Sequence, residues 1–117
     1  MYDENNIFAK ILRSEIPCDK VYEDDDVLFF YDINPVTKIH IIGIPKVKCT
    51  NFSDFVTKSN IGVISNFFKK THAIISKLGI SETGYRIVSN SGVDGGQEVP
   101  HFHVHILGGE KIGSKIK

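Results

Sequence analysis

The chain contains no tryptophan, one methionine and only two cysteines among its 117 residues. The cysteines, Cys18 and Cys49, are far apart in the sequence and form no Cys-x-x-Cys pattern. A disulfide framework depends on several cysteines in an oxidising compartment. We therefore expect two free thiols in a reducing cytosol and no disulfide.

The chain also lacks an excess of either charge, because 14 Lys and Arg residues balance 14 Asp and Glu residues. A nucleic acid or an anionic membrane would favour a basic surplus, so we expect neither as a partner. Residues 1–6 are polar and acidic, and we find neither a signal peptide nor a membrane-spanning run. The sequence predicts one cytoplasmic domain over residues 1–117, with a core at about 6–109 and a solvated, lysine-containing tail at 110–117.

Hydrophobic periodicity predicts an α+β fold. Residues 61–78 carry apolar side chains at helical spacing, follow the cap candidates Ser59 and Asn60, and precede Gly79, which predicts a long amphipathic helix. His72 lies in this helix, where we expect a surface position without a catalytic role. Links of hairpin length favour an antiparallel five-stranded sheet whose helices, a long one and a short N-terminal one, pack on one face. The other expected elements are a helix at 7–13 and strands at 21–23, 27–32, 40–45, 85–90 and 99–107.

The most informative segment is 101–107, in which histidine occupies every second position. In an extended strand His101, His103 and His105 line one face, and the apolar residues between them line the other. The apolar face suits packing against the long helix, so we expect the histidine face to be open to solvent or ligand. Histidine titrates near neutral pH and acts as nucleophile, acid, base or metal ligand. The pattern indicates an active site.

Besides catalysis, the histidine pattern could indicate a metal site or a structural network without function. Alternate strand positions are about 6.5–7 Å apart, so His101 and His105 are separated by about 13 Å. Zinc needs each ligand nitrogen within about 2.1 Å, and one ion on all three histidines would be strained, although two of them and a third ligand remain conceivable. A structural network without function suits one buried histidine better than three, because each needs polar partners. We expect no metal and no cofactor.

A glycine-rich loop, residues 91–98, runs directly into the histidine segment. Gly92, Gly95 and Gly96 allow backbone N–H groups to turn toward an anion without obstruction by a Cβ atom. Most such loops only form turns, but this one would hold a phosphate close to His103. A bond between phosphorus and an imidazole nitrogen forms and breaks near neutral pH.

These features together resemble the histidine-triad (HIT) family, whose motif alternates three histidines with apolar residues. Leu107-Gly108-Gly109 is similar to the Hint-like branch of nucleoside phosphoramidases, and histidine at 105 differs from the nucleotidylyltransferase branch. Glu98 stands where animal Hint proteins carry a serine, and Asn6 and Ala9 stand where some bacterial members have zinc-binding cysteines. The likeness runs from Ile7-Phe8 to Gly109 and includes Glu15-Ile16-Pro17, Tyr22-Glu23-Asp24-Asp25, Tyr31-Asp32-Ile33-Asn34-Pro35, His40, Ile44-Pro45-Lys46, 85–90 and 95–99.

The resemblance implies a homodimer with a continuous sheet, and a purine nucleoside monophosphate bound by each subunit. It implies that His103 attacks the α-phosphorus to form a nucleotidyl-histidine, that His105 contacts the phosphate or leaving group, and that His101 and His40 complete the histidine cluster. Asp32 matches a ribose-binding position. The resemblance assigns Asn90, Gln97 and Val99 to the phosphate side of the nucleotide, and Phe8, Ile11, Ile16, Phe30 and Ile33 to the surroundings of the base. Gly96 and Glu98 are two further expected nucleotide-binding positions, and the sequence leaves the role of Glu98 open.

The function implied is hydrolysis of purine nucleoside 5′-phosphoramidates or related nucleotidyl conjugates, as in an adenosine 5′-monophosphoramidase. Two alternatives use the same pocket. One is a nucleotide-binding regulator whose hydrolysis is incidental, and the other is a dinucleoside polyphosphate hydrolase.

Overall fold

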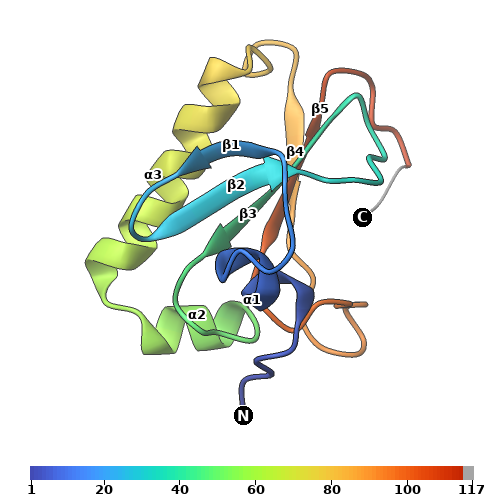
Figure 1. Ribbon diagram of the computed structural model, residues 1–117. Helices are drawn as coiled ribbons and strands as arrows, with labels where there is room; N and C mark the ends of the chain where they lie inside the picture. The colour runs from blue at the N-terminus through green and yellow to red at the C-terminus, as the bar shows by residue number, and fades with distance from the viewer. Residues whose placement is uncertain (115–117) are drawn as a thin grey trace.

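The computed structural model describes residues 1–114 and has the α+β architecture that the sequence predicts (Figure 1). Its five strands form one antiparallel sheet in the order β1-β2-β3-β5-β4. The lysines of the expected tail at 115 and 117 lie outside the described residues. The elements are α1 (Ile7–Leu12), β1 (Lys20–Glu23), β2 (Val27–Tyr31), β3 (Ile39–Pro45), α2 (Phe52–Lys58), α3 (Ile61–Lys77), β4 (Tyr85–Val88) and β5 (Val104–Gly108).

The predicted long helix is confirmed as α3, and its ends follow the expected signals. The Asn60 side chain accepts a hydrogen bond from the N–H of Val63, which caps the first turn. Gly79 follows the helix with φ of +75°, a left-handed conformation that glycine adopts at little cost. His72 is exposed on this helix, as expected.

The predicted strand at 99–107 is wrong in its first half, because β5 begins only at Val104. Pro100 has no N–H to give to a strand partner. The N–H of His101 bonds to the carbonyl of Val99, and the N–H of Phe102 bonds to the carbonyl of Cys49. The chain therefore reaches the sheet through an irregular segment that carries two of the three histidines.

Helix α2 was not predicted, because it has only seven residues and its sequence is mixed polar and apolar. Local side chains start it. The Asn51 side chain accepts from the N–H of Asp54, and the Asp54 carboxylate accepts from the N–H of Thr50. Phe55 on this helix stacks on Phe102, with ring centroids 4.9 Å apart, which anchors α2 to the core.

Each face of the sheet has its own hydrophobic cluster. One cluster lies between the sheet and α3 and includes Phe29, Phe67 and Phe102, together with Val104 and Ile106. The apolar residues that alternate with the histidines therefore pack against the long helix, as predicted. On the opposite face, beside α1, the cluster comprises Phe8, Leu28, Phe30, Ile42 and Ile44. The prediction that the helices pack on one face is therefore wrong for α1, because Phe8 packs against Phe30 on the other face.

The register of β3 against β5 places two histidines on the α1 face. Ile42 lies opposite His105, and His40, two residues before Ile42 on β3, points to the same side. Ile42 belongs to the cluster beside α1. The sheet therefore brings His40 and His105 together on the face away from α3.

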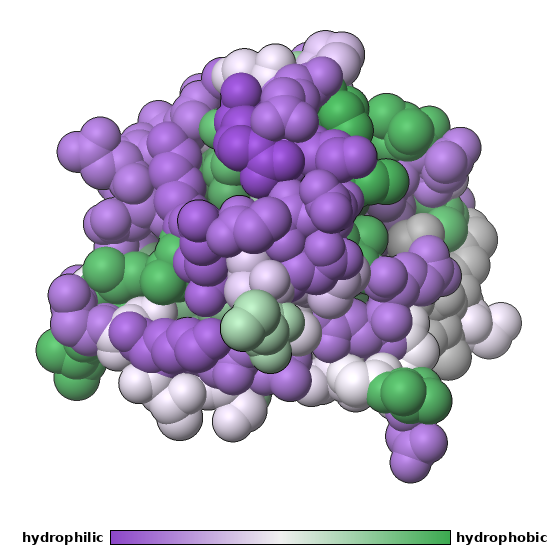
Figure 2. All heavy atoms as spheres, turned by 60° about the horizontal axis from the view of Figure 1, so that its bottom comes forward, coloured by the Kyte–Doolittle hydropathy of each residue, from purple (hydrophilic) through white to green (hydrophobic). Residues whose placement is uncertain are grey.

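The surface drawn in Figure 2 is mostly hydrophilic, and its apolar side chains lie in small separate groups. Within residues 1–114, no helix combines the length and the apolar character needed to span a membrane.

Gly43 provides a test of the core on the α3 side. It lies opposite Phe29, and a Cβ atom added to it would come within 2.4 Å of the Phe29 ring. That ring stacks on Phe67 and cannot move without disturbing the cluster. We expect Gly43→Ala to lower the free energy of unfolding by about 1–3 kcal/mol in urea denaturation.

Gly62→Ala is the matched control. Gly62 is exposed near the start of α3, where an added Cβ meets only the tip of the Asn60 side chain. Because alanine favours helix, we expect this variant to stay within about 1 kcal/mol of the original protein. Equal stabilities of the two variants would contradict the packing assigned to Gly43.

Candidate active site

A cavity of about 320 Å³ opens on the α1 face of the sheet. Its walls come from α1, the end of β2, the glycine-rich loop and β5. The cavity is the size of a small-molecule site and combines apolar walls with a few polar groups at one end. The residues of the sequence hypothesis that line it are Phe8, Ile11, Ile16, Phe30, Asp32, Ile33, Asn90, Gly96, Glu98, Val99, His103 and His105.

Three residues of the hypothesis do not line the cavity. His101 and His40 are buried behind it, at 0 % and 1 % exposure, and Gln97 lies in the loop beside it. Other residues line it without having been singled out by the sequence. These residues are Ile7, Pro17, Cys18, Tyr31, Asn34 and Ile42. Most of them adjoin an expected residue in the sequence, and this adjacency is the signal that could have identified them.

His103 has a defined proton position. Its Nδ1 lies 2.7 Å from the carbonyl oxygen of His101, and a carbonyl only accepts hydrogen bonds. Nδ1 therefore carries the proton, and in the neutral ring the lone pair lies on Nε2. The edge of the Phe8 ring packs on the imidazole at a centroid distance of 4.9 Å. This arrangement suits Nε2 for attack on an electrophile in the cavity.

A second chain of hydrogen bonds orients His40 and His105. The backbone N–H of Val36 donates to Nδ1 of His40, so the His40 proton lies on Nε2. That Nε2 is 3.0 Å from Nδ1 of His105, which must then accept the hydrogen bond. His105 therefore carries its proton on Nε2. The backbone amide of Val36 thus determines, through His40, which nitrogen of His105 carries the proton and acts as the hydrogen-bond donor.

Asp32 connects this chain to the cavity. One carboxylate oxygen accepts from the N–H of Asn34 at 2.7 Å, and the other lies 3.3 Å from Nε2 of His40. The side chain of Asp32 is 10 % exposed. A carboxylate in this position can accept hydrogen bonds from neighbouring hydroxyl groups of a ligand.

Asp32, His40 and His105 form the one group of side chains among residues 1–114 that could hold a metal ion. Ligand atoms of Asp32, His40 and His105 lie within 4.8 Å of one another. A cation bound there would have to displace the proton on Nε2 of His40, which the Val36 N–H holds on that nitrogen. The observed distances fit the hydrogen-bonded cluster directly.

The prediction of a histidine face open to solvent or ligand is wrong for His101. This ring is buried, with Nε2 at 2.8 Å from the carbonyl oxygen of Pro45 and Nδ1 at 2.6 Å from the hydroxyl of Tyr2. Burial, as the main cause, lowers the pKa of His101 to about 4, so the ring is neutral near pH 7. The cause lies in the irregular backbone before Val104, which breaks the strict alternation of a strand.

Gln97 braces the glycine-rich loop. Its side-chain N–H groups donate to the carbonyls of Thr50 and Val99, and its side-chain oxygen accepts from the N–H of Gly92. The backbone of Gly96 has φ of +73°, which favours glycine at this turn. The phosphate contacts that the resemblance assigns to the loop stay a prediction.

Comparison with known proteins shows to which family the chain is related. A family model for the HIT domain matches residues 13–112. A HIT-like protein of Rickettsia prowazekii is 42% identical over 112 residues, which cover 96% of this chain and 93% of the relative. A purine nucleoside phosphoramidase of Escherichia coli is 41% identical over 113 residues, covering 97% of this chain and 94% of the relative.

Solved structures show the same similarity in three dimensions. A histidine triad protein from Clostridium difficile has a TM-score of 0.86 and 41% identity, with 99% of this chain and 100% of that chain covered. A HIT family hydrolase from Legionella pneumophila has a TM-score of 0.84 and 36% identity, with 95% and 98% covered. With its buried histidine cluster, its sheet and these relatives, the chain belongs to the HIT domain family.

Proposed function

We propose that the protein hydrolyses purine nucleoside 5′-phosphoramidates or related nucleotidyl conjugates, with His103 as the nucleophile. The observation that carries this proposal is the hydrogen bond from Nδ1 of His103 to the His101 carbonyl, which leaves the lone pair on Nε2 in a ring that lines the cavity. The name of the Escherichia coli relative, a purine nucleoside phosphoramidase, supports the choice of substrate class.

In the first half of the reaction, Nε2 of His103 attacks the α-phosphorus. A phosphorus–nitrogen bond forms to the imidazole, and the bond from phosphorus to the leaving amine breaks. The leaving nitrogen takes its proton from solvent, and the Nε2–H of His105, which the Val36–His40 chain keeps protonated, donates a hydrogen bond to the departing group. The proton of His103 stays on Nδ1, hydrogen-bonded to the His101 carbonyl, while the ring becomes cationic.

In the second half, water attacks the phosphorus of the nucleotidyl-histidine. The attacking water releases a proton to solvent, which balances the proton taken up in the first half, and His105 keeps its own proton on Nε2 throughout. The bond between phosphorus and Nε2 of His103 breaks, and the electron pair returns to that nitrogen. The products are the nucleoside monophosphate and the regenerated enzyme.

The remaining walls suit a nucleoside. Phe8, Ile11, Ile16 and Phe30 provide apolar walls for a flat base, and Asp32 lines the same cavity at 3.3 Å from Nε2 of His40. We assign the Asp32 carboxylate to the 2′- and 3′-hydroxyls of ribose, because it accepts hydrogen bonds from both more strongly than a neutral group does. The cytoplasmic location expected from the sequence stays a prediction.

We also propose that two copies assemble through β4. This strand lies at the edge of the sheet, bonded only to β5 within the described residues, and Tyr85 and Ile87 on it are 41% and 46% exposed. An exposed apolar edge strand is a hazard for a monomer, and pairing with a two-fold copy removes it. The sheet would then continue across the dimer.

The nucleophile is tested by His103→Ala with an adenosine phosphoramidate as substrate. We expect turnover to be lost, because no other lone pair replaces Nε2, while adenosine monophosphate affinity stays within about tenfold in calorimetry. His72→Ala, on the exposed side of α3, is the control and should keep full activity. Turnover near the original rate in His103→Ala would contradict the assignment. Binding without turnover in the original protein would favour the regulatory alternative.

Ribose recognition is tested by Asp32→Asn. Each charge-assisted hydrogen bond contributes about 1.5–3 kcal/mol, so we expect ribonucleotide affinity to fall by about tenfold or more and the preference over 2′-deoxy analogues to shrink. Asp94→Asn, exposed in the glycine-rich loop, makes the same charge change outside the cavity and should have little effect. An unchanged preference in calorimetric titration of Asp32→Asn would count against the assignment.

Assembly is tested by sedimentation at micromolar concentration. We expect about twice the monomer mass of 13.1 kDa, and we expect Ile87→Lys to shift the protein toward the monomer by placing a charge on the pairing edge. Ile61→Lys adds the same charge at a residue of 85% exposure on α3 and should leave the mass unchanged. A monomeric original protein would show that the edge is not an interface.

A further inference from the structure

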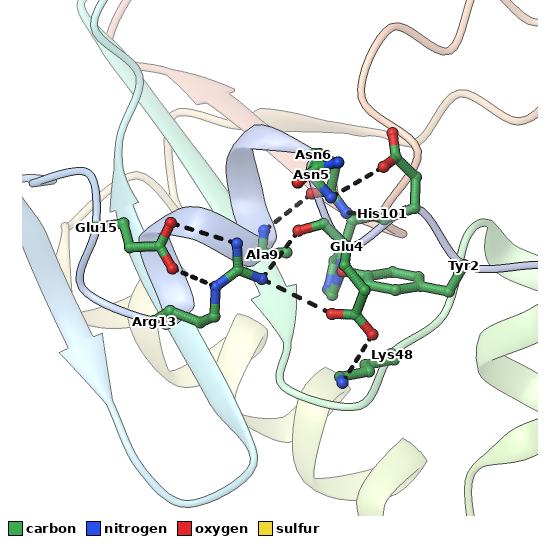
Figure 3. A network of polar contacts seen from close by, with 10 residues as sticks. Tyr2, Glu4, Asn5, Asn6, Ala9, Arg13, Glu15, Lys48 and His101 are labelled. Carbon is green, nitrogen blue, oxygen red and sulfur yellow. Dashed lines mark hydrogen bonds and ion pairs between the residues drawn. The ribbon is translucent and has the colours of Figure 1, made fainter.

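The segment that precedes α1 reaches behind the cavity and contacts the histidine cluster. Figure 3 shows the Tyr2 side chain directed at His101, with Glu4 between Arg13 and Lys48. The Tyr2 hydroxyl lies 2.6 Å from Nδ1 of His101, and the two rings meet edge to face at 5.6 Å. Tyr2 does not line the cavity. Its hydrogen bond to the histidine cluster is made to His101.

The partners of His101 determine the direction of this hydrogen bond. Its Nε2 faces the carbonyl of Pro45, which accepts only, so Nε2 carries the proton. Nδ1 of the neutral ring is then an acceptor, and the Tyr2 hydroxyl is its donor. Burial raises the pKa of Tyr2 and lowers that of His101, so near pH 7 the hydroxyl keeps its proton and the imidazole stays neutral.

We propose that Tyr2 is a positioning residue of this active site, which holds the His101 ring in place and thereby orients the His101 carbonyl that accepts the Nδ1 proton of His103. This inference rests on the proposed function for its catalytic consequence. Tyr2 donates a hydrogen bond to the His101 ring, and this ring donates to the carbonyl of Pro45. The backbone carbonyl of His101 in turn accepts from Nδ1 of His103, the proposed nucleophile. Fixing the ring at two points restrains the backbone whose carbonyl selects the proton position of His103.

The residues that follow Tyr2 hold it in this position. Glu4 pairs with Lys48 at 2.8 Å and with Arg13 at 3.7 Å, which ties the segment to the chain after β3 and to the end of α1. The buried side chain of Asn6 caps α1 by accepting from the N–H of Ala9, and it donates to the carbonyl of Asp3. The arrangement also gives Asn6, which the sequence matched to a zinc-binding position of other family members, a structural role.

Without the hydroxyl, Nδ1 of His101 would be a buried acceptor that has lost its donor. Such a group destabilises its position, and the ring is free to shift or to admit water. A small displacement of the His101 carbonyl changes the direction of the Nδ1–H bond, and with it the aim of Nε2 on His103. Misaimed nucleophiles lose rate in the chemical step while substrate binding, made elsewhere in the cavity, is kept.

The test is Tyr2→Phe, which removes only the hydroxyl, studied by nitrogen NMR of ¹⁵N-histidine-labelled protein. In the original protein we expect His101 protonated on Nε2 and His103 on Nδ1, with the His103 N–H slow to exchange. In Tyr2→Phe we expect the His101 Nδ1 signal to move toward that of an unbonded acceptor and the His103 N–H to exchange faster. Tyr22→Phe is the matched control, because it removes a hydroxyl that bonds to Asp24 outside the cavity.

Kinetics with an adenosine phosphoramidate provide the second readout. We expect Tyr2→Phe to lower kcat by about three- to tenfold with KM within about twofold, and Tyr22→Phe to leave both nearly unchanged. An unchanged kcat, a change in KM alone, or unchanged His101 and His103 spectra would each overturn the proposal. The spectra of the original protein test it independently of any variant, because an Nδ1-protonated His101 also contradicts it. If the original protein were inactive, the proposed hydrolase function would be contradicted. The NMR spectra would then still show whether Tyr2 positions His101 and His103.

Discussion

A single backbone carbonyl determines the chemistry available at this site. The oxygen of His101 accepts the Nδ1 proton of His103, and the position of that proton decides that the lone pair of the neutral ring lies on Nε2. A second backbone group, the N–H of Val36, does the same for His40 and, through it, for His105. The main chain, which cannot change its donor and acceptor roles, thus fixes the proton positions of three imidazoles. Side chains alone would leave both tautomers of each ring accessible.

The two hydrophobic clusters keep those backbone groups in register. The cluster on the α3 side packs Phe67 and Phe102 against the sheet, and Gly43 leaves the space that the Phe29 ring occupies there. The opposite cluster, with Phe8, supports α1 and one wall of the cavity. Since His105 lies on β5 and His40 on β3, the strand register sets the distance between them. Core packing and proton placement are therefore parts of the same structure.

Much of this structure could be predicted from the sequence, because it follows from hydrophobic periodicity and from residues that favour the ends of helices and strands. Apolar spacing and the Asn60 and Gly79 signals locate α3, and the alternation of histidines with apolar residues assigns opposite faces of β5. The prediction is wrong where contacts remote in sequence decide. The bond from Phe102 to Cys49 replaces strand pairing before Val104, and the contact between Tyr2 and His101 joins residues 99 positions apart. No local pattern around Tyr2 distinguishes it from an ordinary polar residue.

In the proposed reaction, Nε2 of His103 forms a covalent bond to phosphorus during turnover. Mass spectrometry of peptides from reactions quenched in base, where phosphorus–imidazole bonds survive, tests this most directly with an adenosine phosphoramidate as substrate. We expect one nucleotidyl group per active site, carried on His103 and attached at Nε2. Turnover at an undiminished rate with the nucleotidyl group on another residue, or attached at Nδ1 of His103, would contradict it.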